Sequence, residues 1–121
     1  MLYLAALLFF LLGLAHSVLG ERYILIRLFR RSDLPKLFGG TEFTTQTLRF
    51  AWHITTVAWW GFSSMLVLAQ RNQLTPDNAL LSVVLIALFS SALPLIITKG
   101  RHLSWLVLIA IAALIYFSGA V

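Results

Sequence analysis

The chain has 121 residues, of which 60% are hydrophobic and only 11% are charged, and its formal net charge is +5. Because soluble domains carry about 25% charged residues, this composition excludes an ordinary soluble domain and predicts a single transmembrane domain over residues 1–121. The absence of cysteine excludes disulfides, thiolate metal ligands and a cysteine nucleophile. The basic residues adjoin apolar segments, so we assign the positive charge to contact with anionic membrane lipid and not with nucleic acid.

Four apolar segments follow one another, each close to the ~20 residues that a helix needs to cross a membrane. The first covers residues 2–20, and small residues at helical spacing along it are typical of close helix contact: Ala6, Gly13, Ser17 and Gly20. Residues 21–46 are predicted to form a cytoplasmic loop, whose basic and aromatic beginning either extends the first helix or lies along the lipid headgroups. The remaining spans are expected at residues 47–69, 79–98 and 102–120.

The basic residues are distributed unevenly among the connections, which indicates how the chain is oriented. Only Arg71 lies in the second connection, and all the others lie in or beside the first and third: Arg22, Arg27, Arg30, Arg31, Lys36, Arg49, Lys99 and Arg101. Because Lys and Arg concentrate in cytoplasmic loops, the first and third connections are predicted to be cytoplasmic and both termini non-cytoplasmic. The predicted fold is an all-α, integral membrane four-helix up-down bundle in a bacterial-type cell inner membrane.

All three histidines of the chain are expected at the cytoplasmic end of this bundle. His16 lies roughly 7 Å before Glu21 along the first helix, and His53 lies roughly 6 Å after Arg49 along the second. His102 opens the fourth span beside the third connection. A polar ring in lipid needs a hydrogen-bond partner or a ligand role, and neutral imidazole is a frequent ligand of zinc, copper and iron.

We therefore predict a histidine site that binds a transition metal or a b-type haem, with electron transfer as one use of such a site. A flat haem ring also needs apolar walls and a partner for its propionates, and the imidazoles need groups that orient them. The residues predicted for these roles are His16, His53 and His102 for a metal, His16, His53, Arg49 and Trp60 for a haem, and Glu21 and Ser17 as supporting groups.

Two further interpretations stay open. In one, the protein is an accessory or scaffold membrane protein, within a homo-oligomer or a larger membrane complex, and its buried histidines only specify helix packing. In the other, the histidines form a proton path with Glu21 and Arg49, although no acidic residue lies deep in a span to continue it. No serine stands in a GxSxG context, so the sequence identifies no catalytic residue and leaves open whether the protein is an enzyme.

The string Arg101-His102-Leu103-Ser104-Trp105 resembles the Arg-His-Leu-x-Trp string of the cytochrome b subunits of succinate dehydrogenase. The resemblance covers only this string, and Leu106 stands where an acidic residue usually follows in that family. The N-terminal quinone-site region of the family has no counterpart here. We therefore take no activity from the resemblance.

Overall fold

The computed structural model describes residues 1–119, and helices are the only regular structure within them. The chain order is α1 (Leu2–Leu19), the π-helical turn η1 (Gly20–Leu25), α2 (Ile26–Leu28), α3 (Glu42–Gln70), α4 (Pro76–Ile97) and α5 (Ser104–Phe117). Because α1, η1 and α2 follow without a break, the described part of the chain forms four helices.

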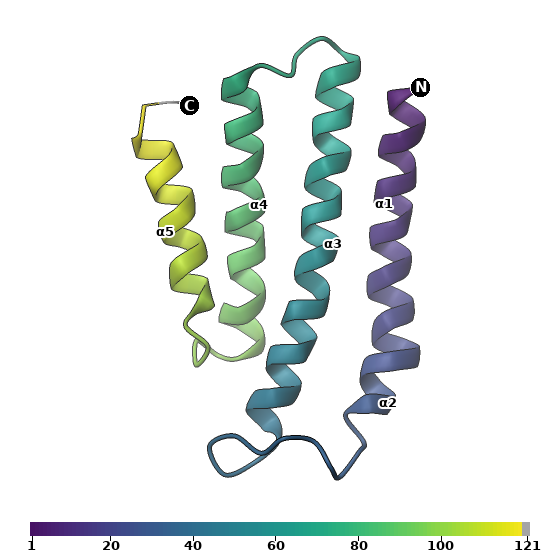
Figure 1. The fold of residues 1–121 in the computed structure, drawn as a ribbon, viewed down its shortest axis with the longest axis vertical. Coiled ribbons are helices and arrows are strands. Elements are labelled where there is room, and N and C mark those ends of the chain that lie inside the picture. Colours follow the sequence, from purple (N-terminus) through teal and green to yellow (C-terminus); the bar gives the residue numbers. More distant parts are fainter. Residues whose placement is uncertain (120–121) are drawn as a thin grey trace.

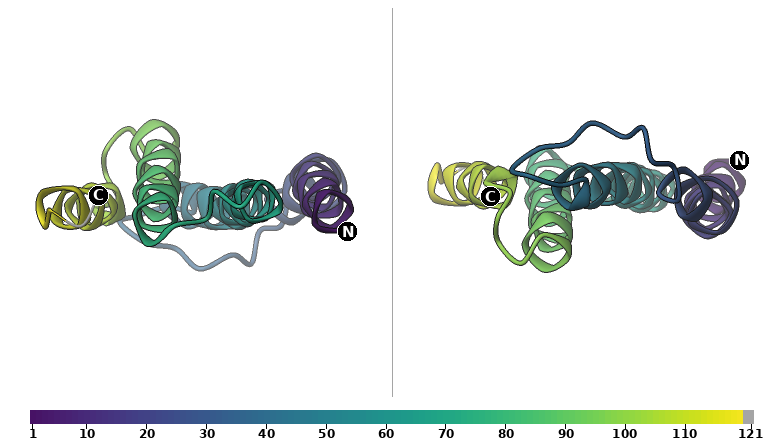
Figure 2. Two further views of the ribbon diagram at one scale, coloured as in Figure 1. Left: turned by 90° about the horizontal axis from the view of Figure 1, so that it is seen from above. Right: turned by 90° about the horizontal axis from the view of Figure 1, so that it is seen from below.

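The four helices stand side by side in a single row, in the order α1, α3, α4 and α5 (Figures 1 and 2). Each helix runs antiparallel to its neighbour, as the up-down prediction requires. Within the described part of the chain, α1 contacts neither α4 nor α5, and α3 does not contact α5. The predicted closure into a bundle is therefore not confirmed, because the helices form one open layer.

The helix boundaries correct the predicted loop and the predicted fourth span. Of the two predictions for the start of residues 21–46, the helical extension is the one observed, because the first helix continues to Leu28; the loop is therefore shorter, and α3 already begins at Glu42. Leu25 explains the extension, since its side chain is only 2% exposed and would lose this burial in a loop. The fourth helix begins at Ser104 and ends at Phe117, inside the predicted 102–120, so His102 lies in the preceding turn; residue 120 is outside the described part.

Two helices are long and apolar enough to cross a membrane, namely Leu2–Leu28 and Pro76–Ile97, with mean hydropathies of 2.2 and 2.6. Helix α5 is apolar but shorter, and its 14 residues extend about 21 Å. Helix α3 has 29 residues and carries more polar side chains than the other helices. Length and composition therefore single out two candidate spans.

The connections lie at opposite ends of the row. The loop between α2 and α3 and the turn between α4 and α5 lie at one end, and the chain start and the α3–α4 turn lie at the other (Figure 1). The α4–α5 turn contains Lys99 and Gly100, whose φ angles are +53° and +78°. Eight of the nine basic residues belong to the end that carries the two connections, since only Arg71 lies in the α3–α4 turn.

Few side chains are fully buried in this layer. The described apolar core is the contact between α4 and α5, where Val84, Ala87 and Ala112 pack together. Large apolar side chains are exposed along every helix. The contact between α1 and α3 differs, because polar side chains and glycines form it.

Candidate functional site

Helices α1 and α3 approach each other closely because glycine faces tryptophan at two levels. A β-carbon on Gly13 would lie 2.7 Å from Trp60 Nε1, and one on Gly20 would lie 2.2 Å from Trp52 Nε1. Real β-carbons do not come this close, so only glycine fits at either position. The small-residue stripe predicted from the sequence therefore faces α3.

A ladder of hydrogen bonds joins the two helices along this contact. Four side chains on one face of α3 donate to main-chain carbonyls of α1, at positions three or four residues apart on each helix. The bonds are Trp52 to His16 O at 3.1 Å, Thr56 to Gly13 O at 3.2 Å, Trp60 to Phe10 O at 3.1 Å and Ser63 to Ala6 O at 2.8 Å. Each donor thereby obtains a partner without water.

His53 lies in the middle of a second, side-chain network between α1 and α3. Its Nδ1 lies 2.8 Å from Ser17 Oγ, and its Nε2 lies 3.3 Å from Glu21 Oε2. Ser17 Oγ in turn lies 2.7 Å from Thr56 Oγ1. Both ring nitrogens of His53 therefore have partners on the neighbouring helix.

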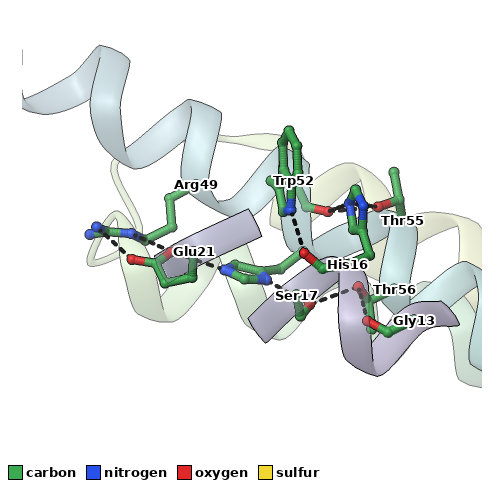
Figure 3. A network of polar contacts seen from close by, with 9 residues as sticks. Gly13, His16, Ser17, Glu21, Arg49, Trp52, Thr55 and Thr56 are labelled. Atoms are coloured by element: carbon green, nitrogen blue, oxygen red, sulfur yellow. Dashed lines mark hydrogen bonds and ion pairs between the residues drawn. The ribbon is translucent and has the colours of Figure 1, made fainter. Parts of the chain in front are cut away.

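Glu21 joins this network to Arg49. The guanidinium Nη2 lies 2.9 Å from Glu21 Oε1, and Arg49 Nε donates to Glu21 Oε2 over 3.2 Å (Figure 3). The Arg49 guanidinium also lies over the Phe29 ring, 5.0 Å from its centre. Both charged side chains are about one-third exposed, so the pair sits at the edge of the helix contact and is accessible from the basic end.

The π-helical turn η1 sets the position of Glu21. A π-turn inserts an extra residue into the helical repeat, and such turns occur frequently at functional sites. Here the turn begins at Gly20, where the Trp52 indole occupies the space of a side chain. The next residue, Glu21, carries the carboxylate that contacts Arg49 and His53.

His16 uses a different set of partners. Its Nε2 lies 2.9 Å from Thr55 Oγ1 and 3.3 Å from Trp52 O. Its ring stacks on the Trp52 indole, with ring centres 4.4 Å apart and an interplanar angle of 2°. Trp59 meets the ring edge-on, with the centres 4.9 Å apart. The contacts hold the His16 ring against α3.

His102 has separate surroundings in the α4–α5 turn. Its ring meets Phe50 edge-on and stacks on Phe43, with centre distances of 4.8 and 5.5 Å. The ring Nδ1 of His102 accepts from the main-chain N–H of Ser104 over 3.3 Å. The main-chain N–H of His102 donates to Thr98 Oγ1 over 3.0 Å. None of the described contacts joins His102 to the α1–α3 network.

The residues predicted to hold a cofactor are only partly brought together. His16, Ser17, Glu21, Arg49, His53 and Trp60 all lie at the α1–α3 contact, and His102 lies apart. No group of three or more His, Asp or Glu side chains that could hold a metal occurs among residues 1–119. The Trp60 ring stacks on Phe10 with ring centres 5.4 Å apart.

Sequence reasoning missed the roles of Trp52 and Thr55, and it did not foresee that Thr56 bonds Ser17. These three residues supply most of the partners of His16 and Ser17 across the helix contact: Thr55 and Thr56 through their hydroxyls, and Trp52 through its main-chain carbonyl and its ring. The spacing of Arg49, His53 and Thr56 along one helical face was the available signal, because a shared face makes a shared network expected. The π-turn left no comparable pattern in the sequence.

An apolar cavity of about 530 Å³ lies on the other side of α3, between α3 and α4. Ser64 and Ser82 are among its lining residues, and their hydroxyls donate to carbonyls within their own helices. The lining is mostly apolar, and the clustered polar side chains lie instead in the α1–α3 network. Comparison of the chain with protein-family models, curated proteins and solved structures found no match.

Proposed function

We propose that the protein is a multi-pass protein of a bacterial-type inner membrane that acts as an accessory or scaffold subunit. In this proposal, His16 and His53 fasten α1 to α3, and they do not hold a cofactor. The observation that carries it is that His16 Nε2 and both nitrogens of His53 are already engaged by groups of the partner helix. A buried polar side chain with protein partners on a neighbouring helix specifies which helices pair and in which register.

Three features support the membrane location. Two helices have the length and hydropathy of spans, large apolar side chains are exposed on every helix, and the basic residues gather at one end of the row. Basic residues concentrate on the cytoplasmic side, so the proposal places the α2–α3 loop and the α4–α5 turn there and both termini outside. Helix α5 would then cross only part of the bilayer thickness, which is about 30 Å.

The close α1–α3 contact favours fastening over cofactor binding. A haem between α1 and α3 would require the two helices to separate. Instead, Gly13 and Gly20 lie in direct contact with tryptophan rings of α3. A metal on His53 would have to displace Ser17 or Glu21. Transition-metal or haem binding therefore stays a prediction that no observation in this structure favours.

The open row explains why a partner is part of the proposal. Helix α1 has a single neighbour in the row, and its free side exposes apolar side chains at helical spacing: Leu4, Leu7, Leu8, Leu11 and Val18. In a membrane such a face meets lipid or another membrane helix. A homo-oligomer or a larger membrane complex would cover it.

The orientation can be tested by labelling single cysteines, since the chain has none of its own. Gly40→Cys places a thiol in the α2–α3 loop, where a β-carbon meets no atom within 4 Å. Gln73→Cys places one in the exposed α3–α4 turn. In intact cells an impermeant thiol reagent should label Gln73→Cys and leave Gly40→Cys unlabelled until the membrane is opened. Labelling of both, or of neither after opening, would contradict the multi-pass proposal.

The role of the histidines is tested on protein purified in mild detergent. Elemental analysis should find no stoichiometric transition metal, and the visible spectrum should show no haem band. Native mass measurement should find the chain in an assembly, either with itself or with another membrane protein. Stoichiometric metal or haem that disappears in His53→Ala would overturn the proposal in favour of cofactor binding. A monomer under all mild conditions would contradict the scaffold role.

A further inference from the structure

At each of its two ends, the His53 network stops at a group that can only accept hydrogen bonds. At one end Thr56 Oγ1 donates to the carbonyl of Gly13 over 3.2 Å. At the other end His53 Nε2 faces the carboxylate of Glu21 at 3.3 Å. A carbonyl and an ionised carboxylate have no proton to donate. The groups between them must therefore supply the proton of every hydrogen bond in the network.

Counting these protons shows that the hydrogen-bond network lacks one proton when His53 is neutral. There are four contacts in sequence, from Gly13 O to Thr56, Ser17, His53 and Glu21. Each hydroxyl supplies one proton, and a neutral imidazole supplies one. Three protons cannot fill four hydrogen bonds between two acceptors.

We propose that the chain of Thr56, Ser17, His53 and Glu21 is a binding site for one exchangeable proton. With this proton bound, Thr56 donates to Gly13 O, Ser17 donates to Thr56, and both nitrogens of His53 donate, one to Ser17 and one to Glu21. The site is thus an imidazolium facing a carboxylate. This assignment goes beyond the scaffold role and does not depend on it.

The two charges nearest the ring act in opposite directions: the Glu21 carboxylate favours an imidazolium, and the Arg49 guanidinium opposes it, so the proton count carries the assignment. Glu21 on η1 faces His53 directly, and Arg49 on α3 is the other cation held by the same carboxylate. On α1 the titratable group at this level, His16, directs its Nε2 to Thr55. Within α4 the only charged residue is Asp77, in its first turn at the opposite end of the row. The proton therefore joins a cluster whose anion is shared by two cations.

His16 provides an internal comparison. Thr55 Oγ1 donates to Trp52 O over 2.7 Å, so its oxygen accepts from His16 Nε2–H. The same Nε2–H can also be shared with the second acceptor, Trp52 O. A neutral His16 ring therefore satisfies every contact described for it, whereas a neutral His53 ring does not.

Loss of the proton must break or weaken one of the four bonds. The terminal contacts are longer, at 3.3 and 3.2 Å, than the inner contacts of 2.8 and 2.7 Å. The contact between His53 and Glu21 also lies at the partly exposed end, where a proton can enter from solvent. Proton release therefore loosens η1 from α3 at the basic end of the row.

The decisive variant is Thr56→Val, because it changes no charge. Without the Thr56 hydroxyl, Ser17 can donate to His53 Nδ1, and a neutral ring then fills both remaining bonds. The imidazolium should therefore be disfavoured by about fivefold, the equivalent of one typical hydrogen bond. Thr56→Ser keeps the hydroxyl and should keep the proton.

The measurement is ¹⁵N NMR of the histidine side chains in the full-length protein in bilayers at one near-neutral pH. We expect His53 to be doubly protonated in the wild type and in Thr56→Ser, and His16 to be singly protonated. The doubly protonated fraction of His53 should fall in Thr56→Val. Ser17→Ala is a second uncharged variant with the same expected direction, because it removes the acceptor of Nδ1–H, and it serves if Thr56→Val does not fold.

Two results would overturn the assignment. The first is a singly protonated His53 in the wild type. The second is an unchanged protonation of His53 in the uncharged variant that folds, since a simple ion pair with Glu21 would be indifferent to that change. Glu21→Gln adds a further check: the amide can donate to Nε2, so a doubly protonated ring in this variant would also contradict the proton count.

Discussion

Replacing Gly20 with alanine should destabilise the contact between α1 and α3, although alanine is the better helix former. A β-carbon at this position would lie 2.2, 2.5 and 2.7 Å from three atoms of the Trp52 indole. The indole cannot move away freely, because it donates to His16 O and stacks on the His16 ring. Alanine therefore forces the indole out of a position held by two interactions.

The magnitude follows from opposing contributions. Overpacking in a close contact costs about 1–3 kcal/mol. Loss of the aromatic stack costs about 0.5–1.5 kcal/mol, and loss of a hydrogen bond between membrane helices costs about 0.6 kcal/mol. The gain in helix propensity from glycine to alanine is about 1 kcal/mol. Gly20→Ala should therefore lower the free energy of unfolding by about 1–4 kcal/mol.

The assay is reversible unfolding in mixed micelles, measured for Gly20→Ala in two backgrounds. In the wild-type background alanine should destabilise. In a Trp52→Ala background the obstructing ring is absent, so the same change should be neutral or stabilising by up to about 1 kcal/mol. The sign of the effect thus depends on one side chain of the neighbouring helix.

The matched control is Gly40→Ala, where a β-carbon meets no atom within 4 Å. This change should leave the free energy of unfolding nearly unaltered. A destabilisation of equal size in both Trp52 backgrounds would refute the reasoning, because it would show that the backbone at Gly20, and not the indole, requires glycine.

Two further predictions concern other parts of the chain. Thr98→Val should destabilise the α4–α5 turn by about 1–2 kcal/mol in the same unfolding assay, because the fully buried Thr98 hydroxyl donates to Pro94 O and accepts from the main-chain N–H of His102. Thr98→Ser keeps the hydroxyl and should not destabilise the turn. Equal losses in the two variants would contradict this reason. The hydrogen bond from Arg31 lowers the pKa of Asp33 from its ordinary 3.8 to about 2. Because that pKa is lowered, the contact is complete above the ordinary value and is lost as the pH falls through about 2. In Arg31→Ala the carboxyl titration, followed by ¹³C NMR, should return towards 3.8, and an unchanged titration would contradict the assigned cause.

Much of the helix layout follows from the sequence alone. The apolar segments at residues 2–20, 47–69 and 79–98 predict α1, α3 and α4 to within a few residues at most ends. The reason is that a helix with a long apolar surface is specified locally by composition. The small residues of the first helix also predict a close helix contact, which Gly13 and Gly20 make with α3.

The rest depends on contacts between helices, which local patterns do not encode. The π-turn at Gly20 arises together with the Trp52 indole on another helix, so no periodicity in the first segment predicts it. The partners of His16 and Ser17 on α3, Thr55 and Thr56, become visible only once α1 and α3 are in register. The contacts of His102 with Phe43 and Phe50 were likewise not foreseen, and no described contact joins His102 to the α1–α3 network.

The claim that His53 fastens α1 to α3 is tested most directly by a double-mutant cycle with Ser17, its partner on the neighbouring helix. The free energy of unfolding would be measured for Ser17→Ala, His53→Ala and the double variant. Hydrogen bonds between membrane helices average about 0.6 kcal/mol and reach about 1.7 kcal/mol, and we expect a favourable coupling energy in this range. A coupling energy indistinguishable from zero, with both single variants folded, would contradict the account.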